Sequence, residues 1–386
     1  MSTDFVFWRP SGRRTNGKNG RDRALQAAYI ASLLNSSDPP DLEELRRIAR
    51  EVGFLSPEIR RHAWPILLGV KSKVDCSSNP EAGPVSYIHK DNKQVQLDVV
   101  RSMCNYGLRR TERERKLADL SAVMNSILAA NPDLHYYQGF NDVCSISIMV
   151  MGTVEQSRPV AERLARFHFR EAMNKTLVAV QQALQIILRV VERRDKKLYL
   201  ALEECGMEPI FAISWILTWF AHDLNSIAQV QRLYDFFIAS HPLMSLYFSA
   251  SLLCFYRKGV MDARGDYTEL HRLMQTLPSD LPIDKLVLDS HRMFQLSPPS
   301  KVIAAASLDR ERAFTGDSMW RVFPYPFAEG EGGEPPPPHG PRLIAWKAAK
   351  GHPHKRMVIR KVGVISGALL GGVVLVQVLG GYVLMS

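Results

Sequence analysis

The sequence predicts an all-α fold, a multi-helix domain followed by one transmembrane helix. Three observations support this fold class. Between Pro40 and Leu308 the apolar residues recur at helical spacing. Sustained two-residue alternation is absent from that region, and hairpin turn signals are few. Near the C-terminal end, residues 362–386 form a run of 25 residues without a formal charge.

Residues 1–37 are predicted to be a mobile basic N-terminal arm. They are rich in Gly, Arg, Asn and Ser and contain one short helical pattern, RALQAAYIASLL, which is a candidate docking helix. The opening MSTDFVFWRPSGRR lacks an apolar run of seven residues, so no signal peptide is expected. The helical domain is predicted over residues 38–310, a length that is ample for a large core.

Two elements near the start of this domain have readable boundaries. In DLEELRRIAREVG the apolar residues share one stripe, and Gly53 follows the helix end. In SPEIRRHAWPILLG, Ser56 is a good N-cap, Pro57 suits the first helical position and Gly69 can close the end. Pro65 is expected to interrupt this second element, which is therefore predicted as a pair of helices.

The apolar and aromatic stretch Glu208–Tyr256 is predicted to be the hydrophobic centre of the domain. The patterning fades after Leu308, and FPYPFAEGEGGEPPPPHGPR has the composition of a spacer. We therefore assign residues 311–345 to a Pro/Gly-rich linker, residues 346–361 to a basic juxtamembrane segment and residues 362–385 to a transmembrane tail anchor.

At about 1.5 Å per residue, a helix over the anchor segment would cross a hydrocarbon layer of about 30 Å. Residues 342–361 hold seven Lys or Arg and no Asp or Glu, and no charge follows the anchor. This bias places the preceding chain on the cytosolic side. A buried core helix is the alternative, although core helices are rarely apolar all round. Gly363, Gly367 and Gly371 would share one face, where a second copy could approach for self-association.

The formal net charge of +10 does not belong to the domain. Residues 1–23 hold six basic and two acidic side chains, residues 342–361 hold seven basic ones, and the rest of the chain holds 36 basic and 37 acidic ones. We therefore expect no nucleic-acid binding. The five cysteines are scattered without Cys-x-x-Cys spacing, a reduced cytosolic pattern with no metal site.

Motifs of self-sufficient catalysis are missing, including a phosphate-binding loop, H-E-x-x-H, G-x-S-x-G and an EF-hand loop. One segment that stands out instead is VQLDVVRSM. Its Val95, Asp98 and Arg101 step by three along a predicted helix, so that Asp98 can orient Arg101. Taken alone, the pair also fits an ordinary solvated salt bridge.

The second segment is NPDLHYYQGFNDV, residues 131–143, in which Pro132 and Gly139 break helix just ahead of an apolar run. A polar turn at the start of a buried helix is typical of a site loop on a rigid scaffold. The alternative is a plain connecting turn in which Asn141 or Asp142 caps the next helix, and the two interpretations are compatible.

Together with R-x-x-x-W at Arg60 and Trp64, the order R-x-x-x-W, V-x-x-D-x-x-R, Y-x-Q-G-x-N-D resembles the TBC domain of Rab GTPase-activating proteins. The resemblance covers about residues 50–290, including WILTWF at residues 215–220 and RLYDFF at residues 232–237. Tyr234 stands where many relatives have Trp, and Val95 where the motif usually starts with Ile.

The resemblance implies that Arg101 is an arginine finger and Gln138 a glutamine finger, both acting in trans on a Rab GTPase in its GTP form. The chain would then be a GTPase activator and not a hydrolase by itself. GTP and Mg²⁺ would belong to the Rab, and the chain would need no cofactor of its own. Supporting or Rab-binding roles fall to Asp98, Tyr136, Gly139, Asn141, Asp142, Arg60 and Trp64. For Arg60 and Trp64, a structural pairing in the core is the alternative.

A TBC-like domain with a C-terminal membrane helix is similar to the tail-anchored branch of the family. That branch implies the endoplasmic reticulum membrane, a single pass, a cytosolic N-terminal domain and a role in early secretory, ER-to-Golgi vesicle traffic. The alternative function is a non-catalytic Rab-binding effector or tether on the same membrane.

Overall fold

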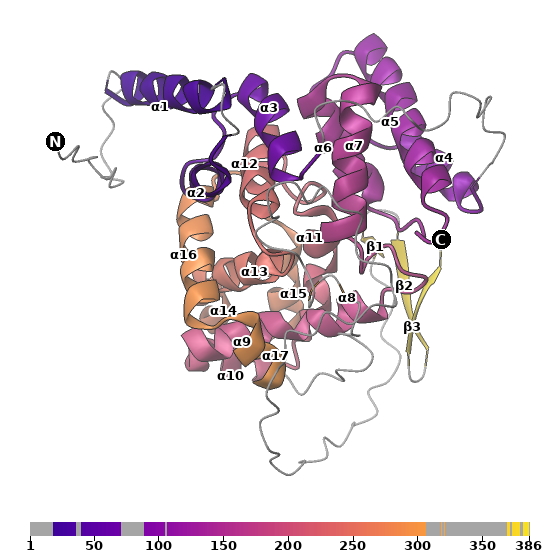
Figure 1. Ribbon diagram of the computed structural model, residues 1–386. Helices are drawn as coiled ribbons and strands as arrows, with labels where there is room; N and C mark the ends of the chain where they lie inside the picture. Colours follow the sequence, from indigo (N-terminus) through magenta and orange to yellow (C-terminus); the bar gives the residue numbers. More distant parts are fainter. Residues whose placement is uncertain are drawn as a thin grey trace. The chain divides into compact units, whose positions relative to one another are not determined.

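The computed structural model of the chain describes residues 18–35, 40–70, 89–104, 106–305, 318, 320, 369–370, 373–378 and 381–385. The chain divides into two compact units, residues 1–342 and residues 343–386. In the described part of the first unit every regular element is a helix (Figure 1). The all-α prediction for the domain is confirmed. Residues 1–17, most of the predicted linker, the basic segment 346–361 and Gly363, Gly367 and Gly371 lie outside the described residues.

Two of the first three helices begin at a side-chain N-cap. The candidate docking helix is α1 (Lys18–Leu34), which buries Ile30 in the core. In α2 (Leu42–Glu51) the Asp41 carboxylate caps the N-terminus by accepting from Glu43 N and Glu44 N. The Ser56 side chain does the same for α3 (Pro57–Leu67) by accepting from Ile59 N. The N-cap predicted at Ser56 is confirmed.

The predicted interruption at Pro65 is wrong, because α3 is one continuous helix with Pro65 inside it. Pro65 lacks the N–H that would bond the carbonyl of Arg61, so α3 loses one hydrogen bond but continues for two more residues. The carbonyl of Pro65 still accepts from Val70 N at 2.8 Å, and Leu68 N donates to Trp64 O. These bonds close the helix end despite the missing donor.

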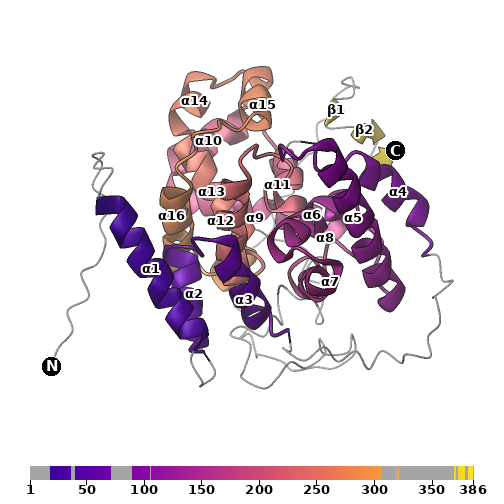
Figure 2. The ribbon, with the colours of Figure 1, turned by 90° about the horizontal axis from the view of Figure 1, so that it is seen from above.

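A group of helices from the first half of the domain packs around α5. Its members are α4 (Asn92–Val100), α5 (Arg110–Ala130), α6 (Phe140–Met151), α7 (Val154–Arg163) and the π-helical turn η1 (Leu164–His168). Helix α5 contacts α4, α6 and α7, and α6 also contacts α3. Figure 2 shows α4–α7 together on one side of α12 (Ile227–Ile238), with α1 and α2 on the other.

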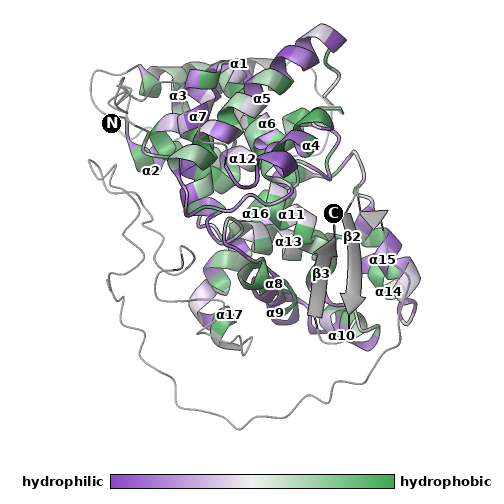
Figure 3. Ribbon diagram, turned by 90° about the vertical axis from the view of Figure 1, so that its right-hand side faces the viewer, coloured by the Kyte–Doolittle hydropathy of each residue, from purple (hydrophilic) through white to green (hydrophobic). Residues whose placement is uncertain are grey.

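The second half of the domain is built around α13 (Met244–Phe255), which packs between α9 (Gln185–Arg194) and α16 (Ile283–Leu296). Figure 3 shows hydrophilic and hydrophobic residues sharing most of these helices, as expected for elements that bury one face. Trp215, Phe237 and Phe248 are among the fully buried side chains, so the predicted hydrophobic centre at residues 208–256 agrees with the structure. The elements are α8 (Val178–Ala183), α9 (Gln185–Arg194), α10 (Lys196–Glu204), the 3₁₀ turn η2 (Pro209–Ala212), α11 (Ile213–Thr218), α12 (Ile227–Ile238), α13 (Met244–Phe255), α14 (Arg257–Asp262), α15 (Tyr267–Gln275), α16 (Ile283–Leu296) and α17 (Pro299–Ala305).

The second unit differs from the predicted transmembrane helix over residues 362–385. Its described residues form an antiparallel meander of β1 (Leu369–Leu370), β2 (Val373–Val378) and β3 (Gly381–Met385) in the order β1-β2-β3. Leu370 pairs with Val373, and Val378 pairs with Gly381. The segment is rich in β-branched Val, and each pair of strands is separated by two residues that include Gly, a hairpin signal. Among the described residues, no helix combines the length and the apolar character that crossing a membrane requires.

Candidate functional site

Helix α4 ends at an ion pair between Asp98 and Arg101. The Asp98 side chain is completely buried, whereas the Arg101 side chain is 45% exposed, and Arg101 Nη2 donates to Asp98 Oδ1. Gln94 Nε2 also reaches the Asp98 carboxylate, at 3.3 and 3.4 Å. The carboxylate is therefore fixed from the inside, and it holds the guanidinium at the surface.

The turn that follows α4 is fixed by Arg113 of α5. Its guanidinium donates to the carbonyl oxygens of Val100 and Ser102 at 2.7 and 2.8 Å, as basic groups do at helix C-termini. Met103, in the same turn, has a φ of 59°, which is uncommon for a residue other than Gly. Arg113 was not among the residues predicted from the sequence, since no local pattern links it to a turn ten residues earlier.

Tyr136 joins α4 to the loop between α5 and α6. Its hydroxyl donates to Asp98 Oδ2, and its backbone N donates to Asp91 Oδ2 at 3.0 Å. Burial, followed by the neighbouring Asp98 charge, raises the pKa of Tyr136 well above its ordinary value. The phenol thus stays protonated and remains a donor. Asp98 is the common acceptor for the Arg101 helix end and for the loop.

Asn141 holds the other end of this loop, but it does not cap α6. The N-cap is Gly139, whose φ of 119° favours Gly, and Asn141 and Asp142 lie inside the helix. Asn141 Oδ1 accepts from Gly139 N at 3.1 Å, and Asn141 Nδ2 donates to Ser102 Oγ at 3.0 Å. The alternative in which Asn141 or Asp142 is the cap residue is therefore wrong.

Gln138 lies between two anchored neighbours. On one side, the Tyr137 hydroxyl donates to Leu217 O at 2.8 Å, and on the other, Gly139 is held by Asn141. The Gln138 side chain is partly exposed, and no group in the described residues forms a hydrogen bond with its carboxamide. The loop backbone is fixed while the amide is left available.

The structure thus brings Asp98, Arg101, Tyr136, Gly139, Asn141 and Asp142 into one hydrogen-bonded network with Gln138 in its loop. Asp142 connects this network to His222, a residue that the sequence did not indicate. Asp142 Oδ2 lies 3.4 Å from His222 Nδ1. These two residues are eighty positions apart, so no spacing rule would have found the contact.

Arg60 and Trp64 lie elsewhere, in the core. Arg60 Nη2 and Nε donate to the fully buried Asp235 carboxylate at 2.8 to 3.1 Å, and Trp64 Nε1 donates to it at 2.8 Å. Trp64 is fully buried and Arg60 is 7% exposed. A role in contacting a Rab protein does not fit this geometry, because neither side chain offers a surface to a partner. Their structural alternative is the one that the contacts support.

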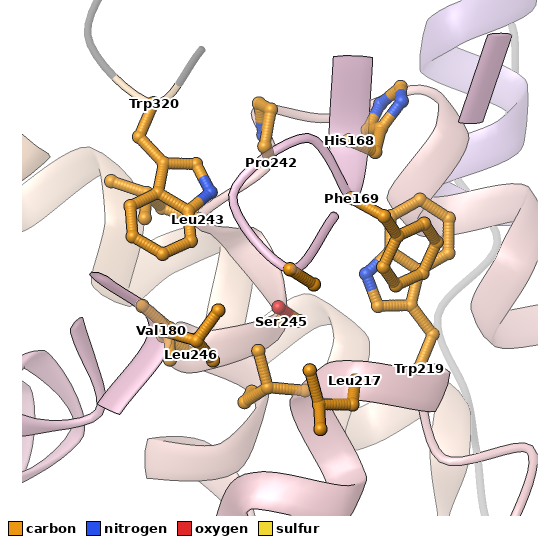
Figure 4. A pocket seen from close by; sticks show the side chains of 12 residues that line it. His168, Phe169, Val180, Leu217, Trp219, Pro242, Leu243, Ser245, Leu246 and Trp320 are labelled. Carbon is orange, nitrogen blue, oxygen red and sulfur yellow. The ribbon is translucent and has the colours of Figure 1, made fainter. Parts of the chain in front are cut away.

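A small apolar pocket lies behind Leu217, the residue that accepts from Tyr137. In Figure 4 the Trp320 ring lies on one side of it, and Phe169 and Trp219 lie on the other. Its volume of about 20 Å³ leaves room for about one water. Trp320 and Ser318 come from the segment predicted as linker, yet both are buried, and Ser318 Oγ donates to Glu171 Oε1 at 2.8 Å.

In the described residues the network orients the half-exposed guanidinium of Arg101 and fixes the loop that carries the partly exposed Gln138. The Rab-GTPase-TBC domain family model matches residues 57–261, a range that contains the whole network. The chain belongs to the Rab-GTPase-TBC domain family.

Individual relatives agree with this assignment. The chain is 34% identical over 305 residues to TBC1 domain family member 20 of Homo sapiens, covering 78% of this chain and 74% of that protein. It is 33% identical over 271 residues to the GTPase-activating protein gyp10 of Schizosaccharomyces pombe, covering 69% of this chain and 70% of the relative.

Solved structures support the fold. The Ypt/Rab-GAP domain of Gyp1p superposes with a TM-score of 0.57 at 15% identity, covering 71% of this chain and 98% of that one. The Chlamydomonas flagellar RabGAP TBC domain gives a TM-score of 0.54 at 15% identity, covering 71% and 92%. At this identity the likeness concerns the fold alone.

Proposed function

We propose that this chain accelerates GTP hydrolysis on a Rab-family GTPase in its GTP form, with Arg101 as arginine finger and Gln138 as glutamine finger. Membership of the Rab-GTPase-TBC family supports the class of activity. GTP and Mg²⁺ belong to the partner GTPase, and this chain supplies side chains only.

The observation that carries the proposal is the asymmetry of the Asp98–Arg101 pair. Asp98 is buried and saturated by donors, whereas the guanidinium that it orients faces outward. GTP hydrolysis leaves little covalent work for a protein, so a planar cation against the β/γ-phosphate oxygens acts by stabilising the charge of the transition state. An arginine finger supplied in trans is worth about 10³ to 10⁵ in rate.

Gln138 has the complementary role. A carboxamide can donate to one group and accept from another, so it can orient an attacking water. The amide of Gln138 has no hydrogen-bond partner among the described residues, and Tyr136, Tyr137 and Asn141 fix its loop, so it suits this task. Orientation of this kind loses little entropy when the partner binds, because the loop is already ordered.

The test is single-turnover GTP hydrolysis across a panel of Rab proteins with the full-length chain in detergent. Arg101→Ala is expected to lower the stimulated rate by about 10³-fold or more, and Arg101→Lys by nearly as much, because Lys keeps the charge but loses the fork. Gln138→Ala is expected to lower it by about 10²-fold. Stimulation that survives in both Ala variants would refute the assignment.

Matched controls are available on the same chain. Arg272 forms a surface i,i+3 pair with Glu269, the sequence spacing of Arg101 and Asp98, but both partners are exposed. Arg272→Ala and the exposed-residue change Gln156→Ala should leave the rate unchanged. Rab binding without acceleration by the parent protein would favour the effector or tether alternative.

We also propose that residues 362–385 attach the protein to the endoplasmic reticulum membrane, with the domain cytosolic and a role in ER-to-Golgi traffic. The support is the uncharged run of 25 residues and its basic flank. An open three-stranded meander leaves edge groups unpaired in hydrocarbon, so a bilayer would favour the helix, which satisfies its own backbone. Gly363, Gly367 and Gly371 would then offer one face for self-association.

Carbonate extraction of membranes tests this attachment. The full chain should stay in the membrane fraction, and a chain ending at residue 361 should not. Release of both by carbonate would exclude a spanning segment. Cross-linking of a Gly367→Ile variant tests self-association, since unchanged dimer yield would remove that role for the glycine face.

A further inference from the structure

His222 occupies a fixed position beside the loop between α5 and α6, residues 131–139, which carries Gln138 and is called the finger loop below. It lies in the turn between α11 and α12, two residues after Phe220. Trp219 and Phe220 are buried and have positive φ values of 49° and 66°. Its backbone N donates to Thr218 Oγ1 at 3.3 Å. The imidazole itself is 51% exposed, with Nδ1 3.4 Å from Asp142 Oδ2.

Hydrogen bonds lead from this imidazole to the residue after Gln138. Asp142 Oδ1 accepts from Asn141 Nδ2 at 3.3 Å, and Asn141 Oδ1 accepts from Gly139 N at 3.1 Å. The two segments are also packed closely, because a Cβ added at Gly139 would lie 3.0 Å from Thr218 Cγ2. A change in the charge of His222 therefore acts on a carboxylate that is two hydrogen bonds from the Gly139 backbone.

Three charged groups face the imidazole. Asp142 of α6 is the hydrogen-bond partner, Asp223 is the next residue in the turn, and Arg101 of α4 is the neighbouring cation. The hydrogen bond to Asp142 raises the pKa of His222 above its ordinary value, although burial and Arg101 oppose this. Burial raises the pKa of Asp223 to about 6, so this carboxyl also titrates near neutral pH.

We propose that His222 is a positioning residue for the finger loop, and that its imidazolium, by holding Asp142, makes GTPase activation depend on pH. The inference depends on the proposed function. When His222 is charged, Asp142 is fixed between the imidazolium and Asn141. When it is neutral, the ionic part of this contact is lost, and the Asn141 amide is held less firmly toward Gly139. Activation is therefore higher below the His222 pKa and falls as the pH rises through it.

The main experiment is the pH profile of single-turnover hydrolysis between pH 6 and 8.5 with the full-length chain, corrected at each pH for hydrolysis by the Rab alone. The parent should lose about two- to fivefold in stimulated rate across this range, the scale of a partly exposed ion pair. His222→Gln should start low and stay flat. His222→Arg, with a permanent charge, should keep the higher rate at pH 8.5.

Two controls separate His222 from its neighbours. His62, an exposed histidine on α3, is the matched control, and His62→Gln should keep the parent profile. Asp223→Asn should keep the fall in rate and move its midpoint to lower pH, because the Asp223 charge also raises the pKa of His222 but Asp223 pairs with Ser214 at 2.9 Å and is not part of the route to Gly139. If His222→Gln retains the parent's pH dependence, or Asp223→Asn removes it, the proposal is refuted.

A second readout needs no GTPase. Histidine-ring NMR of the full-length chain, with the His222 signal assigned by its loss in His222→Gln, should show a pKa above the ordinary value that falls in Asp142→Asn. An unshifted titration would refute the contact itself. If the titration is as expected while the parent accelerates no Rab, the proposed function fails and the pairing of His222 with Asp142 stands.

Discussion

Replacing Arg60 by Met tests whether the first motif of the family is structural in this chain. The Asp235 carboxylate is completely buried and accepts from Arg60, from Trp64 Nε1 at 2.8 Å and from Phe54 N at 2.8 Å. Arg60 contributes its only charged partner among the described residues. Met fills a similar volume and removes the guanidinium without opening a large cavity.

The expected loss follows from this geometry. Removing one partner of a buried ion pair leaves an uncompensated charge and costs about 3–5 kcal/mol of unfolding free energy. Trp64 and Phe54 still donate hydrogen bonds to the Asp235 carboxylate, so we expect a loss in the lower half of this range of unfolding free energy. Adding Asp235→Asn to Arg60→Met should recover part of the loss, since the buried charge disappears.

The pH dependence gives a further check on the cause. Burial already raises the pKa of Asp235, and Arg60 is the first influence that opposes it. Without Arg60 that pKa rises further, so the folded variant takes up a proton that the unfolded chain does not bind near pH 5. Uptake by the folded state favours folding, so the deficit of Arg60→Met should be smaller at pH 5 than at pH 7.

Urea unfolding followed by tryptophan fluorescence measures the loss, because Trp64, Trp215 and Trp219 are buried. Arg61→Met is the matched control. Arg61 is the next residue, is 40% exposed and bonds one carbonyl, that of Val150, so it should cost about 1 kcal/mol or less. Wherever Arg60→Met is folded, its GTPase stimulation should match the parent. A variant with parental stability and lost stimulation would refute the structural role.

Three other substitutions follow from the same structure. Gly139→Ala places a Cβ on a backbone with a φ of 119°, only 3.0 Å from Thr218 Cγ2. The loop that carries Gln138 should shift, and stimulated hydrolysis should fall about tenfold or more. An unchanged rate would contradict the argument that this loop is fixed. Trp320→Ala should lower the unfolding free energy by about 3 kcal/mol, measured by urea titration, whereas Leu296→Ala, at a residue that is 74% exposed, should cost about 0.5 kcal/mol or less. Burial lowers the pKa of His241 to about 4, so between pH 7 and pH 5 only the unfolded chain binds a proton at this residue. The free energy of unfolding should therefore fall by about 2 kcal/mol over that range. His241→Gln should lose less stability over that range, and equal losses would contradict the assignment.

The sequence predicts local features of this fold well where one residue decides the outcome. Ser56 is a polar residue followed by Pro57 at the predicted helix start, and it caps α3 as expected. The prediction at Pro65 failed because the effect of a proline depends on its distance from the helix end. Pro65 removes one bond, which its N–H would have made to Arg61 O, and only two residues of α3 follow it, so a single missing bond does not divide the helix.

The C-terminal segment shows a different limit. Freedom from charge and sufficient length predict a spanning helix, but Val-rich runs with Gly between them also suit short hairpins. Residues 373–378 and 381–385 pair as strands in the structure. The composition of this segment is thus compatible with a helix and with paired strands. The sequence alone does not include the solvent, and a bilayer favours the helix because a helix pairs all its backbone groups internally.

The burial of Asp98 is what distinguishes the candidate site from an ordinary helix salt bridge. The sequence motif alone does not predict that burial. The spacing of Asp98 and Arg101 is that of many solvated helix pairs, which contribute little. Here one member has no exposed surface and the other is 45% exposed, because Tyr136 and Gln94 cover the carboxylate from the inside. Ordinary surface pairs lose their geometry to side-chain entropy. Tyr136 and Gln94 already hold the Asp98 carboxylate in one orientation. Pairing with it therefore costs less side-chain entropy, and the Arg101 guanidinium keeps its direction.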